Sequence, residues 1–473
     1  MAVAAHQHGA LPQAEPMYRE VLRLVPRHHQ ALHLLGLLLH QRGEHEGALA
    51  LIDRALGLQP EFPVALNNRG AVLCSLKRFD EALVSYNAAL TLSPDYADAL
   101  ISRAAVLMQL RQGDAALRDC DKAIALAPSL AEAWNNRGIL LQDRHRFEEA
   151  MQAYVESIRL APGYADAHWN LARCCLLIGD YAQGWLEYEW RWRRRRFTSV
   201  PRNFSQPRWQ GEALAGQALL LHAEQGLGDT LQCLRYVPMV VASGAQVWLE
   251  VQVELKPLVQ NLTGVAGVLA YGESLPSFDL HCPLLSLPLI FRTTVDSVPP
   301  AQSLFVDEAL QSDWASKLGP SVGLRVGVVW SGNPSQQDND LRSLPLSDLV
   351  AAMPAGVELI SLQKELRTDA ERQIVASGRV RHFGDALRDF SDTAALLKEV
   401  DVVVSVCTSV AHLAGVMGAP LEVMLQYAHD WRWLLDRDDS PWYPTARLHR
   451  QVVQGDWQPV LAGVADAVRK RLA

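Results

Sequence analysis

The sequence lacks the cysteine pattern, the long apolar runs and the excess of positive charge that mark several classes of protein. Its seven cysteines include no Cys-x-x-Cys pair, which argues against a zinc ribbon or a disulfide framework and favours a reducing compartment. No stretch approaches the roughly 18 consecutive apolar residues of a membrane-spanning helix. A net charge of −8 disfavours broad affinity for nucleic acid or for acidic membranes.

Signals for export and for dinucleotide binding are missing as well. The first residues, MAVAAHQHGALPQ, lack a basic segment followed by a long apolar one, so we expect no secretory signal and a cytoplasmic protein. No Gly-x-Gly-x-x-Gly motif follows a predicted strand, so a nicotinamide enzyme is not expected. With 49% apolar and 20% charged residues, the composition is that of a globular protein. A chain of 473 residues is long enough for two to four domains.

The most specific pattern in the sequence is a repeat of 34 residues. Each unit has two helical patterns separated by a polar turn, such as residues 77–80, and a proline closes the second helix. This is the tetratricopeptide period and pattern, and it predicts an all-α superhelix of about five and a half repeats over residues 1–197. The recurring positions are Ala31, Ala65, Ala99, Ala133 and Ala167, with Pro26, Pro60, Pro94, Pro128 and Pro162.

Five asparagines lie in the first helices of the predicted repeats, at positions that resemble the peptide-binding positions of such arrays. They could hold an acceptor protein or glycan, or they could simply be solvated. The array could equally form the surface of a homodimer. The five residues are Asn67, Asn68, Asn135, Asn136 and Asn170.

The last repeat changes character in residues 184–196, which are rich in tryptophan and arginine. One interpretation is a patch that binds RNA or lipid headgroups. The other is a terminal capping helix whose tryptophans dock on the next domain. Because the whole chain is acidic, we favour the second.

After residue 197 the pattern changes from helix pairs to short apolar strands that alternate with helices. Strands are predicted at 218–222 and 245–251 in a first α/β half, residues 198–320, and at 324–330, 359–362, 402–406 and 421–425 in a second half, residues 321–473. Glycine or Ser/Thr loops follow several of these strands. Ligands of such sheets bind at the carboxyl ends of the strands, so we expect a cleft between the halves.

Residues 401–420 form the best candidate for an anion site. A β-branched run, 402–406, reads as a buried strand. Thr408 or Ser409 is placed to cap a helix whose first turn contains His412, and Gly418 and Pro420 end that helix. A helix N-terminus delivered by a strand offers free backbone N–H groups and a positive dipole end to a phosphate. The alternative is an ordinary strand–turn–helix.

Two motifs resemble those of the heptosyltransferase-like glycosyltransferases (family 9). Residues 222–231, HAEQGLGDTL, with Pro238 look like the opening motif of that family, and residues 408–415, TSVAHLAG, with Gly418 and Pro420 look like its second. The tail around residues 430–444 and the linkage to tetratricopeptide repeats look like bacterial members. The resemblance implies a GT-B fold made of two Rossmann-like domains, with an acceptor-side half followed by a nucleotide-sugar-binding half.

The resemblance assigns roles to individual residues. Asp229 matches a general base that deprotonates the acceptor hydroxyl, although it could merely cap the following helix. Arg342 matches a basic residue that neutralises the leaving diphosphate, although it could be a solvated loop arginine. Backbone N–H groups of residues 408–410 would hold the pyrophosphate, and His412 is either the motif histidine or a satisfied interior ring. The full donor-binding set is Gly226, Gly228, Ser331, Asn333, Gln363, Lys364, Cys407, Thr408, Ser409, Val410 and His412.

Cys407 departs from the family pattern, because the family has an acidic residue there, near the donor sugar. Loss of one charged hydrogen bond costs about 1.5–3 kcal/mol, which would weaken the enzyme or alter its choice of donor. The nearest acidic motif for a metal, at residues 338–340, lies in a polar loop, so we expect no metal and no cofactor. The sequence therefore predicts an inverting, metal-independent glycosyltransferase with a nucleotide-sugar substrate. The alternative is a weakened or inactive transferase fold that acts as a scaffold.

Overall fold

The computed structural model describes residues 1–195, 197, 199–336 and 339–472, and all structural statements below refer to these. They form two compact units, residues 1–171 and residues 172–473. The boundary falls inside a helix, α11 (Ala165–Ile178). The domain boundaries predicted at residues 197 and 320 remain predictions.

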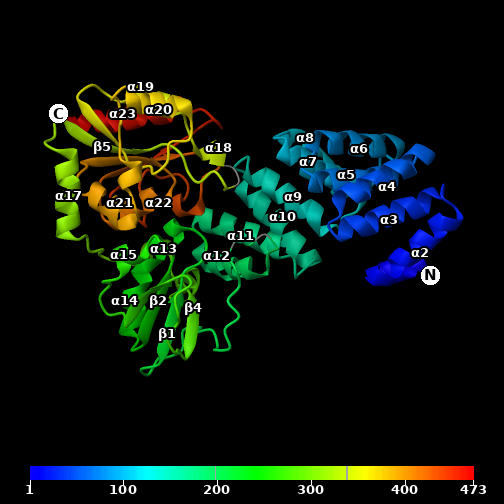
Figure 1. The fold of residues 1–473 in the computed structure, drawn as a ribbon, viewed down its shortest axis with the longest axis horizontal. Coiled ribbons are helices and arrows are strands. Elements are labelled where there is room, and N and C mark those ends of the chain that lie inside the picture. Colours follow the sequence, from blue (N-terminus) through cyan, green and yellow to red (C-terminus); the bar gives the residue numbers. More distant parts are fainter. Residues whose placement is uncertain (196, 198, 337–338, 473) are drawn as a thin grey trace. The chain divides into compact units, whose positions relative to one another are not determined.

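The first unit consists of helices arranged as consecutive antiparallel pairs (Figure 1, blue to cyan). Helix α2 is the second helix of an incomplete repeat, and the pairs α3/α4, α5/α6, α7/α8 and α9/α10 follow at the predicted spacing. The predicted tetratricopeptide superhelix is confirmed. Its helices are α1 (Ala2–Gln7), α2 (Leu11–Leu24), α3 (His29–Gln41), α4 (His45–Leu58), α5 (Pro63–Ser75), α6 (Phe79–Leu92), α7 (Ala97–Gln109), α8 (Gly113–Leu126), α9 (Ala131–Gln142) and α10 (Phe147–Leu160).

Small residues at the repeat positions explain why the paired helices approach so closely. A Cβ atom at Gly70 would overlap the ring of Tyr86, and one at Gly138 would overlap the ring of Tyr154. The repeated alanines are fully buried as well, for example Ala65 and Ala99. Each helix pair therefore buries its apolar face against its neighbours, as expected for a stacked array.

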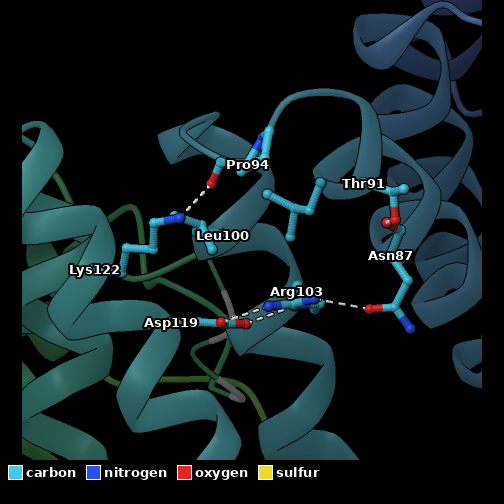
Figure 2. Close-up of a pocket in the computed structure, with 8 residues that line it drawn as sticks. Asn87, Thr91, Pro94, Leu100, Arg103, Asp119 and Lys122 are labelled. Carbon is cyan, nitrogen blue, oxygen red and sulfur yellow. Dashed lines mark hydrogen bonds and ion pairs between the residues drawn. The ribbon is translucent and has the colours of Figure 1, made fainter.

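Arginines that recur at the repeat spacing tie successive helices together. Figure 2 shows one of them, Arg103, which donates two hydrogen bonds of 2.7 Å to the carboxylate of Asp119 and one of 2.9 Å to Asn87. Nearby, Lys122 donates to the carbonyl oxygen of Pro94 at 2.7 Å. These residues line a cavity of about 360 Å³. Because its charged groups are already paired with one another, we interpret this cavity as a structural joint between repeats.

The second unit begins with the end of α11 and with α12, and its first half contains a parallel sheet. The strand order is β3-β2-β1-β4, and all pairs are parallel. The elements are α12 (Tyr181–Tyr188), η1 (Glu189–Arg193), β1 (Ala218–His222), α13 (Leu227–Cys233), η2 (Leu234–Tyr236), α14 (Val237–Ala242), β2 (Gln246–Val251), α15 (Lys256–Val259), β3 (Gly267–Ala270), β4 (Leu280–Pro283), η3 (Leu284–Ser286), α16 (Leu287–Ile290), η4 (Val295–Ser297) and α17 (Glu308–Leu318).

A second parallel sheet follows, with strand order β10-β9-β8-β5-β6-β7. The α/β architecture predicted after the repeats is confirmed. The elements are β5 (Leu324–Val329), α18 (Asn339–Arg342), α19 (Leu346–Ala352), β6 (Val357–Ser361), α20 (Asp369–Ala376), β7 (Arg381–His382), η5 (Gly384–Ala386), α21 (Phe390–Leu397), β8 (Val402–Val406), α22 (Ser409–Val416), β9 (Leu421–Leu425), η6 (Trp431–Trp433), β10 (Ala446–Arg450) and α23 (Gln458–Leu472).

Helices cover both faces of the second sheet. Alternate valines of β5 and β8 pack against α19 and α23 in one apolar core, and α22 contacts β8 and β9 from the opposite side (Figure 1). All five residues of β8 are buried, as expected for a central parallel strand.

Each sheet has one point at which the strand order reverses, and such points are where parallel sheets bind ligands. In the second sheet β5 and β8 are neighbours, and the chain proceeds outward from each in opposite directions. In the first sheet the corresponding neighbours are β1 and β4. The loops after these four strands are therefore the places to look for a site.

An aromatic cluster joins α12 to both halves of the second unit. Trp185 donates its indole N–H to the carbonyl oxygen of Thr293 at 3.0 Å, and Trp442 donates to the hydroxyl of Tyr181 at 2.9 Å. The Trp185 ring also contacts that of Trp431 edge to face, with centroids 5.2 Å apart. The predicted docking of the last repeat on the α/β region is confirmed. Within the described part of the chain, no helix is long and apolar enough to span a membrane.

Candidate functional site: the crevice between β5 and β8

The loop after β5 forms one wall of the candidate site. The hydroxyl of Ser331 accepts hydrogen bonds from Gln363 at 2.9 Å and from Arg367 at 3.1 Å. The guanidinium of Arg342 lies against the backbone of Gly332, so closely that a Cβ atom at this position would collide with it. The structure thus brings Ser331, Gln363 and Arg342 together, and their role in donor binding remains a prediction.

Two arginines converge on this loop. Arg342, at the end of α18, donates to Asn339 at 3.1 Å, to Gln336 and to the carbonyl oxygen of Cys407 at 3.5 Å, all neutral oxygens. Arg367 also donates to the carbonyl oxygen of Gly332. Burial lowers the pKa of Arg342, the nearby Asp430 carboxylate opposes that effect, and the charge of Arg367 adds to it. The two guanidinium groups repel each other, and a bound anion would relieve that repulsion.

Helix α22 points its first turn into the same loop. Thr408 occupies the N-cap position, but its side chain does not cap the helix. The Thr408 hydroxyl instead lies 3.1 Å from that of Ser405. Thr408 thus stands at the predicted cap position, but the predicted capping hydrogen bond by its side chain is not made. The N–H groups of Val410 and Ala411, the usual partners of such a cap, are therefore not bound by the Thr408 side chain.

Cys407 is a poor candidate for a nucleophile. Its Sγ accepts a hydrogen bond from the indole of Trp433 at 3.2 Å. Burial raises the pKa of the thiol to about 11, so it is protonated at neutral pH. A reactive cysteine needs a thiolate, which this environment disfavours.

His412 is an interior ring that joins the two halves. Its Nδ1 lies 2.6 Å from the hydroxyl of Tyr443, and its ring stacks on Trp433. A Cβ atom at Gly228 would press into the His412 ring, so the first turns of α13 and α22 face each other there. Burial lowers the pKa of His412 to about 3. The ring is therefore neutral and serves packing at this contact.

Asp229 faces the second half from the first turn of α13. Its Oδ2 accepts the backbone N–H of Gly226 at 2.7 Å, and its Oδ1 forms an ion pair with Arg432. The carboxylate thus caps its own helix, as one of our two interpretations required, and it also pairs across the halves. Its side chain is 18% exposed, so it is reachable from solvent as well.

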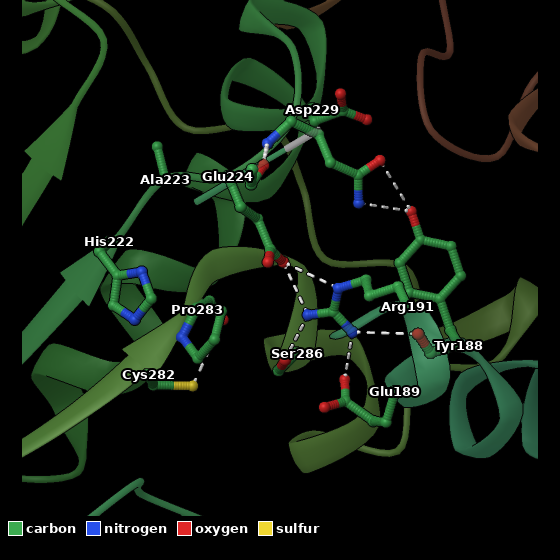
Figure 3. A network of polar contacts seen from close by, with 12 residues as sticks. Tyr188, Glu189, Arg191, His222, Ala223, Glu224, Asp229, Cys282, Pro283 and Ser286 are labelled. Atoms are coloured by element: carbon green, nitrogen blue, oxygen red, sulfur yellow. Dashed lines mark hydrogen bonds and ion pairs between the residues drawn. The ribbon is translucent and has the colours of Figure 1, made fainter. Parts of the chain in front are cut away.

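The corresponding crevice of the first sheet is filled by the protein itself (Figure 3). Arg191 of η1 has no exposed surface and donates to Glu224, which follows β1, and to Ser286, which follows β4, both at 2.7 Å. It also donates to Glu189 at 2.7 Å. One oxygen of Glu224 is buried with no hydrogen-bond partner among the described residues. Arg191 thus occupies the place between β1 and β4 where a ligand would lie.

Other predicted site residues lie outside the crevice or have different surroundings. Asn333 is exposed and bonds within its own turn to Ser335. Lys364 is exposed and donates to the carbonyl oxygen of Arg388 at 3.4 Å. Asp338 lies outside the described residues. Elsewhere in the described chain, no group of three or more His, Cys, Asp or Glu side chains is arranged to hold a metal ion.

The asparagines of the repeats are more enclosed than a solvated set would be. Asn67, Asn135 and Asn136 are each less than a tenth exposed. Asn170 donates to Asn135 at 2.9 Å, and the side chain of Asn68 lies 2.8 Å from His33. The side-chain oxygen of Asn67 and the nitrogen of Asn136 are buried without partners among the described residues. Peptide binding at these positions remains a prediction.

Sequence reasoning missed Arg367 and Arg432. Arg367 lies in an unremarkable loop after β6, and only the fold brings it to Ser331. Arg432 lies in the family-like tail, whose residues resembled known ones without suggesting a role. A search for arginines after each strand would have found both.

Buried neutral histidines predict a loss of stability in acid. Burial lowers the pKa of His222 and of His412 to about 3, against about 6.5 in an unfolded chain. Between these values the unfolded state binds more protons, so the stability present above pH 6.5 falls as the pH falls. Each histidine contributes about 1.4 kcal/mol per pH unit. We expect urea unfolding at pH 7.5, 6 and 5, followed by tryptophan fluorescence, to show this slope.

The replacement His222→Gln tests whether His222 contributes to that slope. All tryptophans except Trp134 and Trp169 lie in residues 172–473, so the fluorescence reports mainly on the unit that contains both histidines. The variant should lose one histidine's share of the slope. An unchanged slope would contradict the assignment.

The family models that match this chain lie within the repeats. Residues 1–64, 63–96 and 131–164 match tetratricopeptide repeat families. Protein FlbA of Caulobacter vibrioides is 29% identical over an alignment of 328 positions that covers 63% of this chain and 54% of FlbA. The match thus spans about half the length of this curated relative.

Several solved structures resemble part of the chain. They include Pseudomonas aeruginosa PilF (20% identity, TM-score 0.36, covering 41% of this chain and 87% of that one) and a tetratricopeptide repeat protein of Parabacteroides merdae (23%, 0.35, 40% and 75%). A third is the repeat protein TTC0263 of Thermus thermophilus (21%, 0.33, 37% and 96%).

Proposed function

We propose that this protein is a glycosyltransferase of the GT-B type that moves a sugar from a nucleotide-sugar donor to an acceptor hydroxyl. The observation that carries the proposal is the pair of arginines, Arg342 and Arg367, beside the first turn of α22 at the crevice between β5 and β8. The side-chain hydrogen bonds of both arginines go to neutral oxygens, so neither guanidinium is bound directly to a carboxylate and both are available to a diphosphate. Guanidinium groups and helix N-termini are the usual ligands of phosphate.

The reaction assigns one task to each group. The acceptor oxygen forms a bond to the anomeric carbon while the bond from that carbon to the diphosphate oxygen breaks. The acceptor proton passes to Asp229, and the leaving diphosphate takes the electron pair. Arg342, Arg367 and the backbone of residues 408–410 stabilise the charge that develops there. A displacement of this kind inverts the anomeric configuration, and the base and the anion site need no metal.

The alternative is a scaffold with a transferase fold that no longer acts. Cys407 favours it, because a thiol with a raised pKa cannot replace the carboxylate that the family has near the donor sugar. In that case the repeats would bind a partner protein, and this binding would be the function of the chain. Binding of a nucleotide without turnover of any nucleotide sugar would support this alternative.

Replacement of Arg342 tests the anion site. We expect UDP, ADP or GDP to raise the melting temperature of the full chain. Arg342→Ala should lower the affinity for the nucleotide that binds best by about 10- to 100-fold, because one charged hydrogen bond contributes about 1.5–3 kcal/mol. Isothermal titration calorimetry measures the affinity.

Arg372→Ala is the matched control for this test. Arg372 is exposed and paired with Asp369 on α20, so its loss removes the same charge from the same half. It also donates to the carbonyl oxygen of Leu366 at 3.1 Å, so the control includes any effect of loosening the loop before Arg367. It should leave the nucleotide affinity unchanged. Equal effects of the two variants, or no melting shift with any nucleotide, would contradict the proposed site.

A further inference from the structure

We propose that Arg432, from the second α/β half, positions Asp229, from the first half, for proton abstraction. The inference rests on the proposed transferase function and adds a residue to it. The two residues are 203 positions apart in sequence, and they form an ion pair between the loop after β9 and the first turn of α13.

Arg432 is held on every side. It is 6% exposed, donates to Asp430 at 2.8 Å and to the side-chain oxygen of Gln232, and forms the ion pair with Asp229. Its guanidinium lies 4.2 Å from the ring centroid of Trp431, which itself packs on α12 through Trp185. These contacts fix the orientation of the planar guanidinium group with its fork of N–H donors, and that orientation presents an N–H group to Asp229.

The carboxylate of Asp229 is fixed in turn. Oδ2 is bound by the backbone of Gly226, and Oδ1 is bound by Arg432. Each carboxylate oxygen can accept two hydrogen bonds, so each oxygen keeps a second lone pair for a proton. Without Arg432, Oδ1 would lose the donor that sets the plane of the carboxylate.

Arg432 also acts on the charge of Asp229. Burial is the largest effect on the pKa of Asp229 and raises it, the charge of Asp430 raises it further, and the charge of Arg432 opposes both. Several other titratable or charged groups face this pair or Asp430. They are Tyr181 and Tyr188 of α12, Cys233 of α13, His412 of α22, Cys407, Tyr443, and Arg173, which acts on Asp430. Burial favours the neutral form of the tyrosines, cysteines and histidine among these groups, so Arg432 is the cation that opposes the effect of burial on the pKa of Asp229.

The test compares pH profiles of nucleotide release by the full chain. UDP-glucose, UDP-N-acetylglucosamine and GDP-mannose serve as donor probes with water as acceptor, and the parent chain is compared with R432K, R432A and D430N. In R432A the acid limb of the profile should move up by about 1–3 pH units, the usual effect of one opposite charge. The KM for the donor should change little, because the diphosphate site is elsewhere.

The other two variants separate a positioning role from a merely structural one. In R432K, which keeps the charge, the acid limb should stay within about one unit of the parent limb, while kcat remains reduced because the fork is lost. In D430N the limb should move down, because a competing carboxylate is removed. This opposite shift also stands if R432A fails to fold.

Each outcome has one meaning. A limb that stays in place in both R432A and D430N, or a faster reaction in R432A, overturns the role of Arg432 while the transferase function stands. A parent chain that binds nucleotide but releases none from any probe overturns the proposed function, and the inference with it.

Discussion

Replacement of Asp229 by asparagine is expected to lower sugar transfer by about 10²- to 10⁴-fold, the usual contribution of a positioned general base. Nucleotide affinity should stay within a few-fold, because the arginines of the anion site are not changed. Asp229 accepts hydrogen bonds at both oxygens, so one of these donors will face the new amide N–H₂ group. We therefore also expect a loss of about 1–3 kcal/mol in stability. Transfer and affinity are measured well below the melting temperature of the variant.

Asp307→Asn is the matched control. Asp307 also caps a helix, α17, with its side chain accepting the N–H of Leu310 at 3.0 Å, and it lies away from the crevice. This variant should keep full transfer. If Asp229→Asn transfers as fast as Asp307→Asn, Asp229 is a capping residue alone and another group must take the proton.

Replacement of Arg191 by alanine is expected to destabilise residues 172–473 by about 3–5 kcal/mol, because it leaves a buried carboxylate uncompensated. Arg191 is fully buried and pairs with Glu224, whose side chain is 1% exposed. Burial raises the pKa of Glu224 and Arg191 opposes this. Urea unfolding followed by tryptophan fluorescence measures the change in the free energy of unfolding.

Two further variants make this result specific. Arg193→Ala removes an exposed arginine from the same short helix, where it lies over the Trp190 ring, and should cost less than about 1 kcal/mol. The double replacement Arg191→Met with Glu224→Gln should recover part of the loss, because both charges leave together. An Arg191→Ala variant no less stable than Arg193→Ala would contradict the importance of the network.

The architecture could be predicted from sequence because its signals are local or periodic. The alanine and proline spacing predicted tetratricopeptide repeats. The β-branched run at 402–406 predicted a buried strand, and β8 is one. Strands β1 and β9 begin and end where the apolar runs do. These patterns depend on neighbours in the chain, so no knowledge of the tertiary fold was needed.

The contacts of the site could not be predicted in the same way. Nothing near Arg432 in the sequence indicates a partner at Asp229, because the pair is made only when two separate halves meet. Likewise, nothing in the sequence indicates that the hydroxyl of Ser405, in strand β8, pairs with that of Thr408. Resemblance could name Asp229 and Arg342, but it carried no information on Arg367, whose position depends on a loop conformation.

The Arg191 network has a consequence for dividing this chain into fragments. Glu224 lies in the first α/β half, whereas its partner lies in the short helix that ends the repeats. A fragment that begins at residue 198 would therefore carry an acidic group sealed in its interior without a counter-ion, and it would also lose Trp185. A fragment that begins with α11 at Ala165 keeps both. Helices α12 and η1 are thus an integral part of the α/β unit, and a transplant of that unit onto another array has to take them along.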